Sequence, residues 1–367
     1  MLSRATPEGT RHYASRFTGR IASGHFRERH DLLLSSIGIG TYLGNPDEAS
    51  DRAYAAAVVA AVSGGVNVID TAINYRFQRS ERSIGKALEE LAGAGFARHE
   101  LLLCTKAGYM TPDGDVPDDP REYFAREYLE PGIIRAEDVA AGCHCMTPQY
   151  LDDQLERSLR NLGVASVDVF YLHNPETQLS DVSREDFRAR VRAAFAFLES
   201  AVAAGKVGAY GMATWNAFRQ PPSAEDYISL EEMVELAREV AGEDHHFLYV
   251  QLPFSLAMPE ALLQPNQPLA GRMVPLVSAA HHLGVTVVAS ASLLQGRLAR
   301  NLPAFVQGVI GLESDLLRAL QFARSAPGIT TALVGMGRAA HALENVKLLG
   351  VEPMDEMKFR ELFQRDS

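Results

Sequence analysis

The sequence predicts one α/β domain, a (β/α)8 TIM barrel that spans residues 1–367. Eight short apolar segments alternate strictly with eight segments of helical periodicity, which is the repeat of such a barrel. A doubly wound open sheet would also alternate. However, the Gly38-Ile39-Gly40 segment lacks the third glycine and the immediate helix of a dinucleotide-binding turn. We therefore favour the closed barrel.

The predicted strands are apolar on both faces, as parallel strands are when helices cover the sheet. They are Ser36–Thr41, Val66–Asp70, Leu101–Lys106, Val167–Leu172, Val207–Met212, Phe247–Gln251, Val285–Ser290 and Thr330–Val334. Glycines precede three of these strands, where a helix should end: Gly64-Gly65, Gly205 and Gly284.

The predicted helices repeat apolar residues every three to four positions. They are Ala49–Val62, Arg79–Leu91, Pro148–Leu162, Arg184–Ala204, Ser229–Glu239, Gly271–Leu283, Ser314–Ser325 and Ala339–Leu348. Thr147-Pro148 and Ser229 are typical residues for helix starts.

Two stretches lie outside the repeat. Residues 1–33 are expected to form a short hairpin around Thr18–Gly24 that plugs one end of the barrel. Residues 107–147 form an insertion after the third strand, which should rise over the C-terminal face of the barrel. Loops of this length are usually functional or disordered, and we expect this one to act as a lid that controls substrate access.

Composition excludes several classes of function. The net charge is 35 − 46 = −11, which disfavours nucleic acid and anionic membrane surfaces as partners. No apolar run approaches the roughly 18 residues of a membrane-spanning helix, and Met1–Phe17 lacks the apolar core of a secretory signal. Three cysteines suit a reducing cytoplasm, where we expect the protein to reside. The composition carries no signal for oligomeric state.

Three ionisable residues end consecutive predicted strands: Asp70, Lys106 and His173. Tyr75 follows in the loop after Asp70. Strand ends meet at the C-terminal face of a barrel, so these side chains should converge. A tyrosine hydroxyl has a pKa near 10, and a neighbouring ammonium would lower that pKa while Asp70 holds Lys106 charged. This set could act as a tuned proton donor. It could equally be a structural Asp70–Lys106 ion pair, or Lys106 could form a Schiff base.

Several motifs occur in a recognisable order: Gly38–Tyr42, Val68–Tyr75 with its Asp–x4–Tyr spacing, Thr105-Lys106, Tyr171–His173, Gly211–Asn216 and Leu343–Asn345. In these stretches the chain resembles the aldo-keto reductases. The resemblance implies an oxidoreductase that binds NADP(H), or NAD(H), without a Rossmann fold. It would reduce a small aldehyde or ketone to an alcohol, or catalyse the reverse reaction, by hydride transfer.

The resemblance also implies roles for individual residues. Tyr75 would be the general acid, Asp70 and Lys106 its tuning pair, and His173 the group that orients the substrate. The residues implied at the cofactor are Gly40, Thr41, Tyr42, Asp70, Ala213, Thr214, Gln251, Ser290, Leu293, Gly335, Arg338, His341, Glu344 and Asn345. Among them, Gln251 would contact the nicotinamide carboxamide, whereas Glu344 and Asn345 would contact the adenine.

The chain departs from the family pattern at three places. Ala213-Thr214 replaces the usual Ser-Asn pair, and Ser290 stands where an aromatic residue or arginine is usual. His341 replaces a frequent arginine near the adenosine 2′-phosphate, which leaves Arg338 as the nearest cation. Because Ser290 cannot stack on the nicotinamide ring, we keep as the alternative function a non-catalytic NADP(H)-binding regulatory or sensor protein.

Cys143-His144-Cys145 invites comparison with a metal site. Structural zinc sites commonly place two to four residues inside a cysteine pair and use a second pair, and neither feature is present. We therefore predict no metal, and expect the two cysteines to pack at the base of the insertion.

Overall fold

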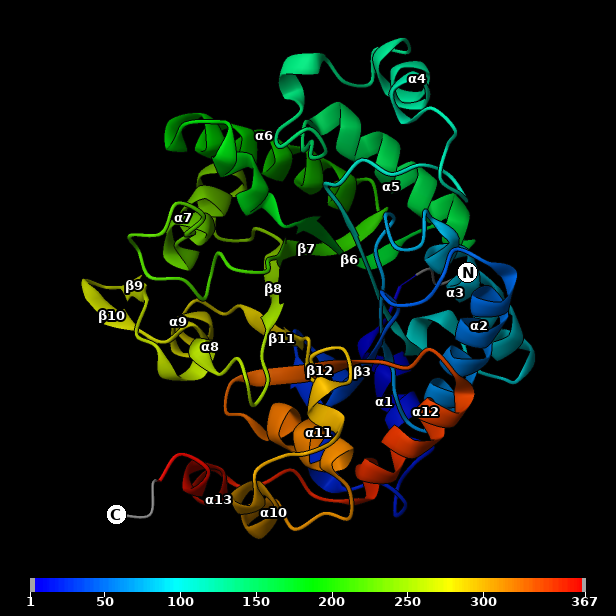
Figure 1. Ribbon diagram of the computed structural model, residues 1–367, viewed down its shortest axis with the longest axis vertical. Helices are drawn as coiled ribbons and strands as arrows, with labels where there is room; N and C mark the ends of the chain where they lie inside the picture. Colours follow the sequence, from blue (N-terminus) through cyan, green and yellow to red (C-terminus); the bar gives the residue numbers. More distant parts are fainter. Residues whose placement is uncertain (1–3, 365–367) are drawn as a thin grey trace.

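The computed structural model describes residues 4–364 and is built around a closed barrel of parallel strands (Figure 1). Around the barrel the order is β11-β12-β3-β4-β5-β6-β7-β8. The strands are β3 (Ile37–Gly40), β4 (Val68–Asp70), β5 (Leu102–Ala107), β6 (Val167–His173), β7 (Val207–Ala213), β8 (Phe247–Pro253), β11 (Thr286–Ser290) and β12 (Ile329–Gly335). All eight predicted strands are present, which confirms the predicted fold class.

Helices follow the barrel strands and cover their outer faces (Figure 1). They are α2 (Glu48–Ser63), α3 (Arg79–Gly93), α5 (Pro148–Leu162), α6 (Arg184–Ala203), α7 (Leu230–Ala241), α9 (Leu276–His282), α11 (Asp315–Ser325) and α12 (Ala339–Asn345). As predicted, the Thr147 hydroxyl accepts from the backbone N–H of Tyr150, and the Ser229 hydroxyl accepts from that of Glu232.

Smaller elements lie between and beyond these repeats. They are α1 (Pro7–Ser15), β1 (Phe26–Arg29), β2 (Leu32–Ser35), α4 (Pro120–Phe124), α8 (Glu260–Leu263), β9 (Gln267–Leu269), β10 (Arg272–Val274), α10 (Ala304–Ile310) and α13 (Glu356–Glu361). A one-turn π-helix continues α4 through Ala125–Leu129, where helical character was predicted.

Two local predictions are wrong. The N-terminal hairpin is β1–β2, with its turn at His30-Asp31, rather than a hairpin at Thr18–Gly24. The helix predicted to begin at Gly271 begins at Leu276, because 272–274 pair with 267–269 as a second hairpin and Pro275 follows it. Proline lacks the backbone N–H that a helix interior or a strand ladder needs, so the chain changes element there.

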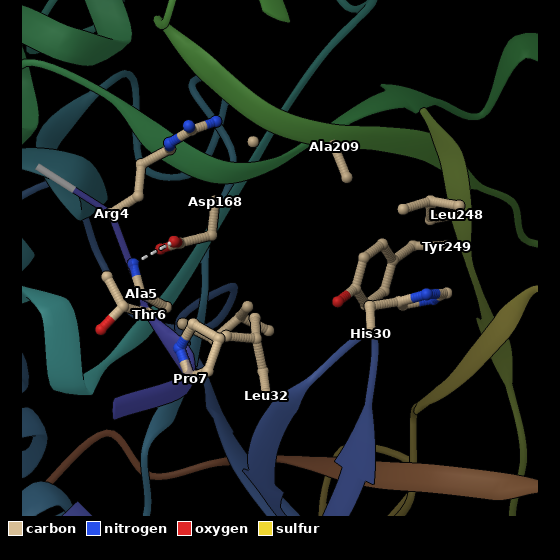
Figure 2. A pocket seen from close by; sticks show the side chains of 12 residues that line it. Arg4, Ala5, Thr6, Pro7, His30, Leu32, Asp168, Ala209, Leu248 and Tyr249 are labelled. Atoms are coloured by element: carbon tan, nitrogen blue, oxygen red, sulfur yellow. Dashed lines mark hydrogen bonds between the residues drawn. The ribbon is translucent and has the colours of Figure 1, made fainter. Parts of the chain in front are cut away.

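The β1–β2 hairpin and the segment before α1 cover the N-terminal end of the barrel. Leu34 of β2 packs into the same cluster as the barrel-interior side chains, and the Ala5 N–H donates to Asp168 Oδ1 at 2.6 Å. Figure 2 shows this end, where Arg4, His30 and Tyr249 border a cavity of about 450 Å³. The Asp168 carboxylate also accepts from Arg98, so the segment before α1 is anchored to a partly buried ion pair.

The insertion separates β5 from α5 and carries a small apolar cluster of its own. Its buried side chains are Tyr128, Ile134 and Cys145, together with Tyr150 of α5. In Figure 1, α4 lies at the edge of the molecule, beyond α5. Cys145 is fully buried and Cys143 half-buried, and both are free thiols.

Within residues 4–364, no helix combines the length and apolar character needed to cross a bilayer.

Candidate active site

The carboxyl ends of β4, β5 and β6 bring the four predicted catalytic residues together. Lys106 Nζ donates to Asp70 Oδ1 at 2.5 Å and to the Thr71 carbonyl at 2.7 Å, and it lies 3.5 Å from Tyr75 Oη. The rings of Tyr75 and His173 meet edge to face, with centroids 5.7 Å apart. Asp70 and Lys106 project from their strands on the same face as the barrel-interior residues Val68 and Cys104, two positions earlier.

Burial decides the electrostatics of the cluster. Burial raises the pKa of Asp70, although Lys106 and the amide of Gln251 oppose this shift. For Lys106, burial lowers the pKa, but Asp70, Tyr75 and Cys104 together outweigh burial, and the net shift is upward. Lys106 is therefore held as an ammonium.

Tyr75 departs from the predicted pKa shift. We expected Lys106 to lower the pKa of the hydroxyl; instead, burial raises it more than Lys106 lowers it. The hydroxyl is thus protonated at neutral pH, as a proton donor must be. His173 has its pKa lowered well below its ordinary value by burial and by Lys106, so its imidazole is neutral.

The turn that carries Tyr75 has unusual backbone geometry. Arg76, Phe77 and Gln78 all adopt left-handed conformations, with φ of 49°, 56° and 70°. The buried Arg76 side chain secures this turn, because its guanidinium donates to Asp51 at 2.6 Å and to the Ser83 hydroxyl at 2.9 Å. Tyr75 therefore sits on a constrained segment between β4 and α3.

One pocket of about 1400 Å³ extends from this cluster across the C-terminal end of the barrel. Asp70, Tyr75 and His173 line it, whereas Lys106 lies buried beneath. Of the residues predicted at the cofactor, those that line the pocket are Gly40, Thr41, Tyr42, Asp70, Ala213, Thr214, Gln251, Ser290, Leu293, Gly335, Arg338, His341 and Asn345. Glu344 is exposed on α12 and lies outside the lining.

Polar atoms along this pocket lack protein partners. Five buried atoms have no hydrogen-bond partner within residues 4–364: Asn74 Oδ1, His173 Nδ1, Thr214 Oγ1, Ser292 Oγ and Asn345 Oδ1. Unpaired buried polar groups are costly, and a bound polar molecule would satisfy them. Their spread from the catalytic cluster to α12 suits an extended ligand such as a dinucleotide.

Sequence reasoning missed several lining residues. Trp215 follows β7, lines the pocket and is 45% exposed, and its backbone N–H donates to Glu176 Oε1 at 2.7 Å. Arg297, which begins a 3₁₀ turn after β11, also lines the pocket. An aromatic directly after a barrel strand was an available signal for Trp215. Arg297 offered none, since its loop has no regular pattern.

The insertion reaches the pocket through Tyr109. Its His144 is buried beside Cys143 and Cys145, but the described residues contain no group of three or more His, Cys, Asp or Glu side chains that could hold a metal ion.

A family model described as the aldo/keto reductase family matches residues 36–302. The chain belongs to this family. The match includes the four catalytic candidates and β3 through β11, and it confirms the resemblance drawn from the sequence motifs.

Individual relatives of this aldo-keto reductase are distant. D-threo-aldose 1-dehydrogenase from Pseudomonas sp is 29% identical over 49% of this chain and 50% of its own. NADH-specific methylglyoxal reductase from Escherichia coli is 29% identical over 39% of each chain. The chain thus spans half or less of the length of these curated relatives.

Among solved structures, an aldo/keto reductase from Klebsiella pneumoniae in complex with NADP and acetate superposes with a TM-score of 0.60 at 17% identity. The match covers 93% of this chain and 94% of that one. This similarity supports the barrel fold over nearly the whole chain.

Proposed function

We propose that this protein is an NADP(H)-dependent oxidoreductase that interconverts a small carbonyl compound and its alcohol. The observation that carries the proposal is the Tyr75 hydroxyl, which lies 3.5 Å from the buried Lys106 ammonium in a pocket of about 1400 Å³ that extends to Asn345 of α12. Family membership and the intact set of Asp70, Tyr75, Lys106 and His173 support it.

The chemistry that we assign follows from these positions. The bound nicotinamide cofactor supplies the hydride. Tyr75 Oη donates the proton to the carbonyl oxygen, and Lys106 stabilises the phenolate that this leaves. The neutral imidazole of His173 can donate a hydrogen bond to the same carbonyl oxygen. Because it is not an imidazolium, it does not compete with Tyr75 as the proton donor. Asp70 fixes Lys106, and the barrel interior below keeps water from the pair.

A non-catalytic cofactor-binding protein would not need this proton-donating set. Ser290, which stands in place of the stacking residue, lines the pocket, but all four members of the proton-donating set are intact. The Schiff-base alternative requires an uncharged, accessible lysine. Lys106 instead lies fully buried beneath the pocket lining, and its ammonium is bonded to Asp70 and Thr71.

The substrate that we propose is a small hydroxylated aldehyde or ketone. Aromatic rings of Tyr42, Tyr75, Tyr109 and Trp215 line the catalytic end of the pocket and can pack against C–H faces. Asn74, with its unpaired carbonyl oxygen, can accept from a substrate hydroxyl. The relative named for aldose supports the same class, because an aldose is a hydroxylated aldehyde.

The direct test is turnover. Oxidation of NADPH and of NADH is followed against hydroxyaldehydes, aldoses, ketoses and unsubstituted aldehydes of matched length, with cofactor binding titrated separately. We expect faster oxidation with the hydroxylated carbonyls. Cofactor binding without turnover of any carbonyl would instead support the regulatory alternative.

Arg338 should set the preference for NADPH. It lies at the start of α12 on the pocket wall, where the family resemblance places the adenosine 2′-phosphate. A charge-assisted hydrogen bond contributes about 1.5–3 kcal/mol, so Arg338→Ala should weaken NADPH binding about 10- to 100-fold. NADH binding, measured in the same titration, should change little. Arg338→Lys is the control, because it keeps the charge; equal losses for both cofactors would contradict this assignment.

The predicted role of the insertion in substrate access can be tested by replacing Pro112–Arg135 with a short Gly/Ser linker, which retains Tyr109 and His144. We expect cooperative melting and cofactor binding to persist, because all eight barrel repeats lie outside this segment. The KM or the substrate preference should change. Unchanged kinetics on every substrate would contradict the access role, and failure to fold would show the segment to be structural.

A further inference from the structure

His144, the central residue of Cys143-His144-Cys145, connects the insertion to the catalytic strand end. His144 Nε2 lies 2.8 Å from the main-chain carbonyl oxygen of His173, and its Nδ1 lies 2.8 Å from Gln178 Nε2. His144 and Gln178 are both buried. The contact joins residues 29 positions apart, which are separated along the chain by α5 and most of β6.

The donors in this chain are determined by chemistry. The guanidinium of Arg190 can only donate, so the Gln178 atom that faces it must be the amide oxygen. The Gln178 amide nitrogen therefore faces His144 and donates to it. His144 Nδ1 must then accept, and the ring proton resides on Nε2, which donates to the His173 carbonyl. Burial lowers the pKa of His144 to about 4, which keeps the ring neutral.

The segment that His144 contacts includes a left-handed residue. Asn174, directly after His173, has φ 47° and ψ 57°, a conformation that asparagine adopts more readily than other non-glycine residues. Two further bonds secure it: the Asn174 N–H donates to the Ala213 carbonyl at 2.6 Å, and Asn174 Nδ2 donates to Tyr109 Oη at 3.1 Å. The Tyr109 ring also meets that of His173 edge to face, at 5.3 Å.

Close approach at Gly108 makes these contacts possible. A Cβ at this position would lie 2.5 Å from His144 Nε2 and 2.7 Å from the His173 carbonyl oxygen. The Gly108 carbonyl in turn accepts from the Cys145 N–H at 2.8 Å, so both ends of the insertion are paired beside His173.

We infer that His144 is a positioning residue. The paired ends of the insertion, through His144, fix the backbone of the His173–Asn174 turn. They thereby hold the His173 imidazole beside Tyr75. The expected loss of kcat rests on the proposed function, whereas the expected position of the His173 ring does not. It also gives the Cys-His-Cys sequence a role other than metal binding.

The experiment compares His144→Phe, which keeps a ring but removes both hydrogen bonds, with His144→Gln, whose amide nitrogen can replace Nε2 as the donor. Misplacement of a catalytic group by about 1 Å can lower the rate about 100-fold, so we expect kcat of His144→Phe to fall about 10- to 100-fold. Cofactor affinity should not change, and His144→Gln should recover most of kcat. In crystals of His144→Phe, the His173 ring should leave its position beside Tyr75.

Tyr128→Phe is the matched control, since it removes a buried hydrogen bond to the Thr111 carbonyl inside the same insertion. Its Tm should fall without loss of kcat. If His144→Phe cannot fold, Gln178→Met removes the donor that fixes the tautomer and should also lower kcat. Wild-type kcat with His173 in place, or no recovery in folded His144→Gln, would overturn the inference. A wild type without carbonyl turnover would refute the proposed function, while the crystals would still decide the inference.

Discussion

Tyr75→Phe should lower carbonyl reduction about 100- to 10,000-fold, because a single general acid contributes about that factor. The fold should be nearly unchanged, since within residues 4–364 the hydroxyl forms a hydrogen bond only with Lys106. Cofactor binding should persist for the same reason. The measurement is kcat with the best substrate of the panel, together with Tm and a cofactor titration.

The control for this variant is Tyr227→Phe, which removes a hydroxyl that donates to the Asn266 carbonyl outside the pocket. It should retain turnover. If Tyr75→Phe keeps more than about a tenth of wild-type turnover, Tyr75 is not the general acid.

Lys106→Met should abolish turnover at neutral pH. The Tyr75 phenolate would lose its neighbouring cation, and the pKa of Tyr75 would rise further because Lys106 is the group that opposes its upward shift. Stability should also fall by about 3–5 kcal/mol, since the buried Asp70 carboxylate would remain unpaired. Rate and urea unfolding are measured together.

A double variant separates the two effects. Asp70→Asn combined with Lys106→Met removes both charges and should regain much of the lost stability, but no turnover. Borohydride treatment of wild type with substrate should leave Lys106 unmodified. A covalent adduct on Lys106, or turnover in the double variant, would contradict the assigned role.

The barrel was predictable because its strands are buried on both faces. Such strands carry apolar residues at nearly every position, which produces short apolar segments such as Val167–Leu172. The hairpin 267–274 was not, because Met273 and Val274 share the spacing of the apolar residues in the helix that follows. The shift of the N-terminal hairpin to Phe26–Ser35 has a similar cause: its turn at His30-Asp31 uses left-handed residues other than glycine.

Within the site, Lys106 was found because a lysine at the end of an apolar strand needs a partner, and Asp70 ends the neighbouring one. The direction of the Tyr75 pKa shift was not found, since it depends on how deeply the ring lies in the pocket. The His144–His173 contact also escaped prediction. It depends on the path of the insertion in space and on a tautomer set by Gln178 and Arg190.

The three left-handed residues after Tyr75 have a consequence for engineering. Each costs roughly 1–2 kcal/mol relative to an ordinary right-handed turn. The reaction end of the barrel therefore holds backbone strain in the turn that carries its proton donor. Substitutions that let Arg76–Gln78 adopt right-handed backbone conformations should raise the Tm. The same substitutions should displace Tyr75, the proton donor, from its position beside Lys106. Heat resistance and turnover should therefore trade against each other at this turn, and stabilising changes are better directed to the opposite end of the barrel.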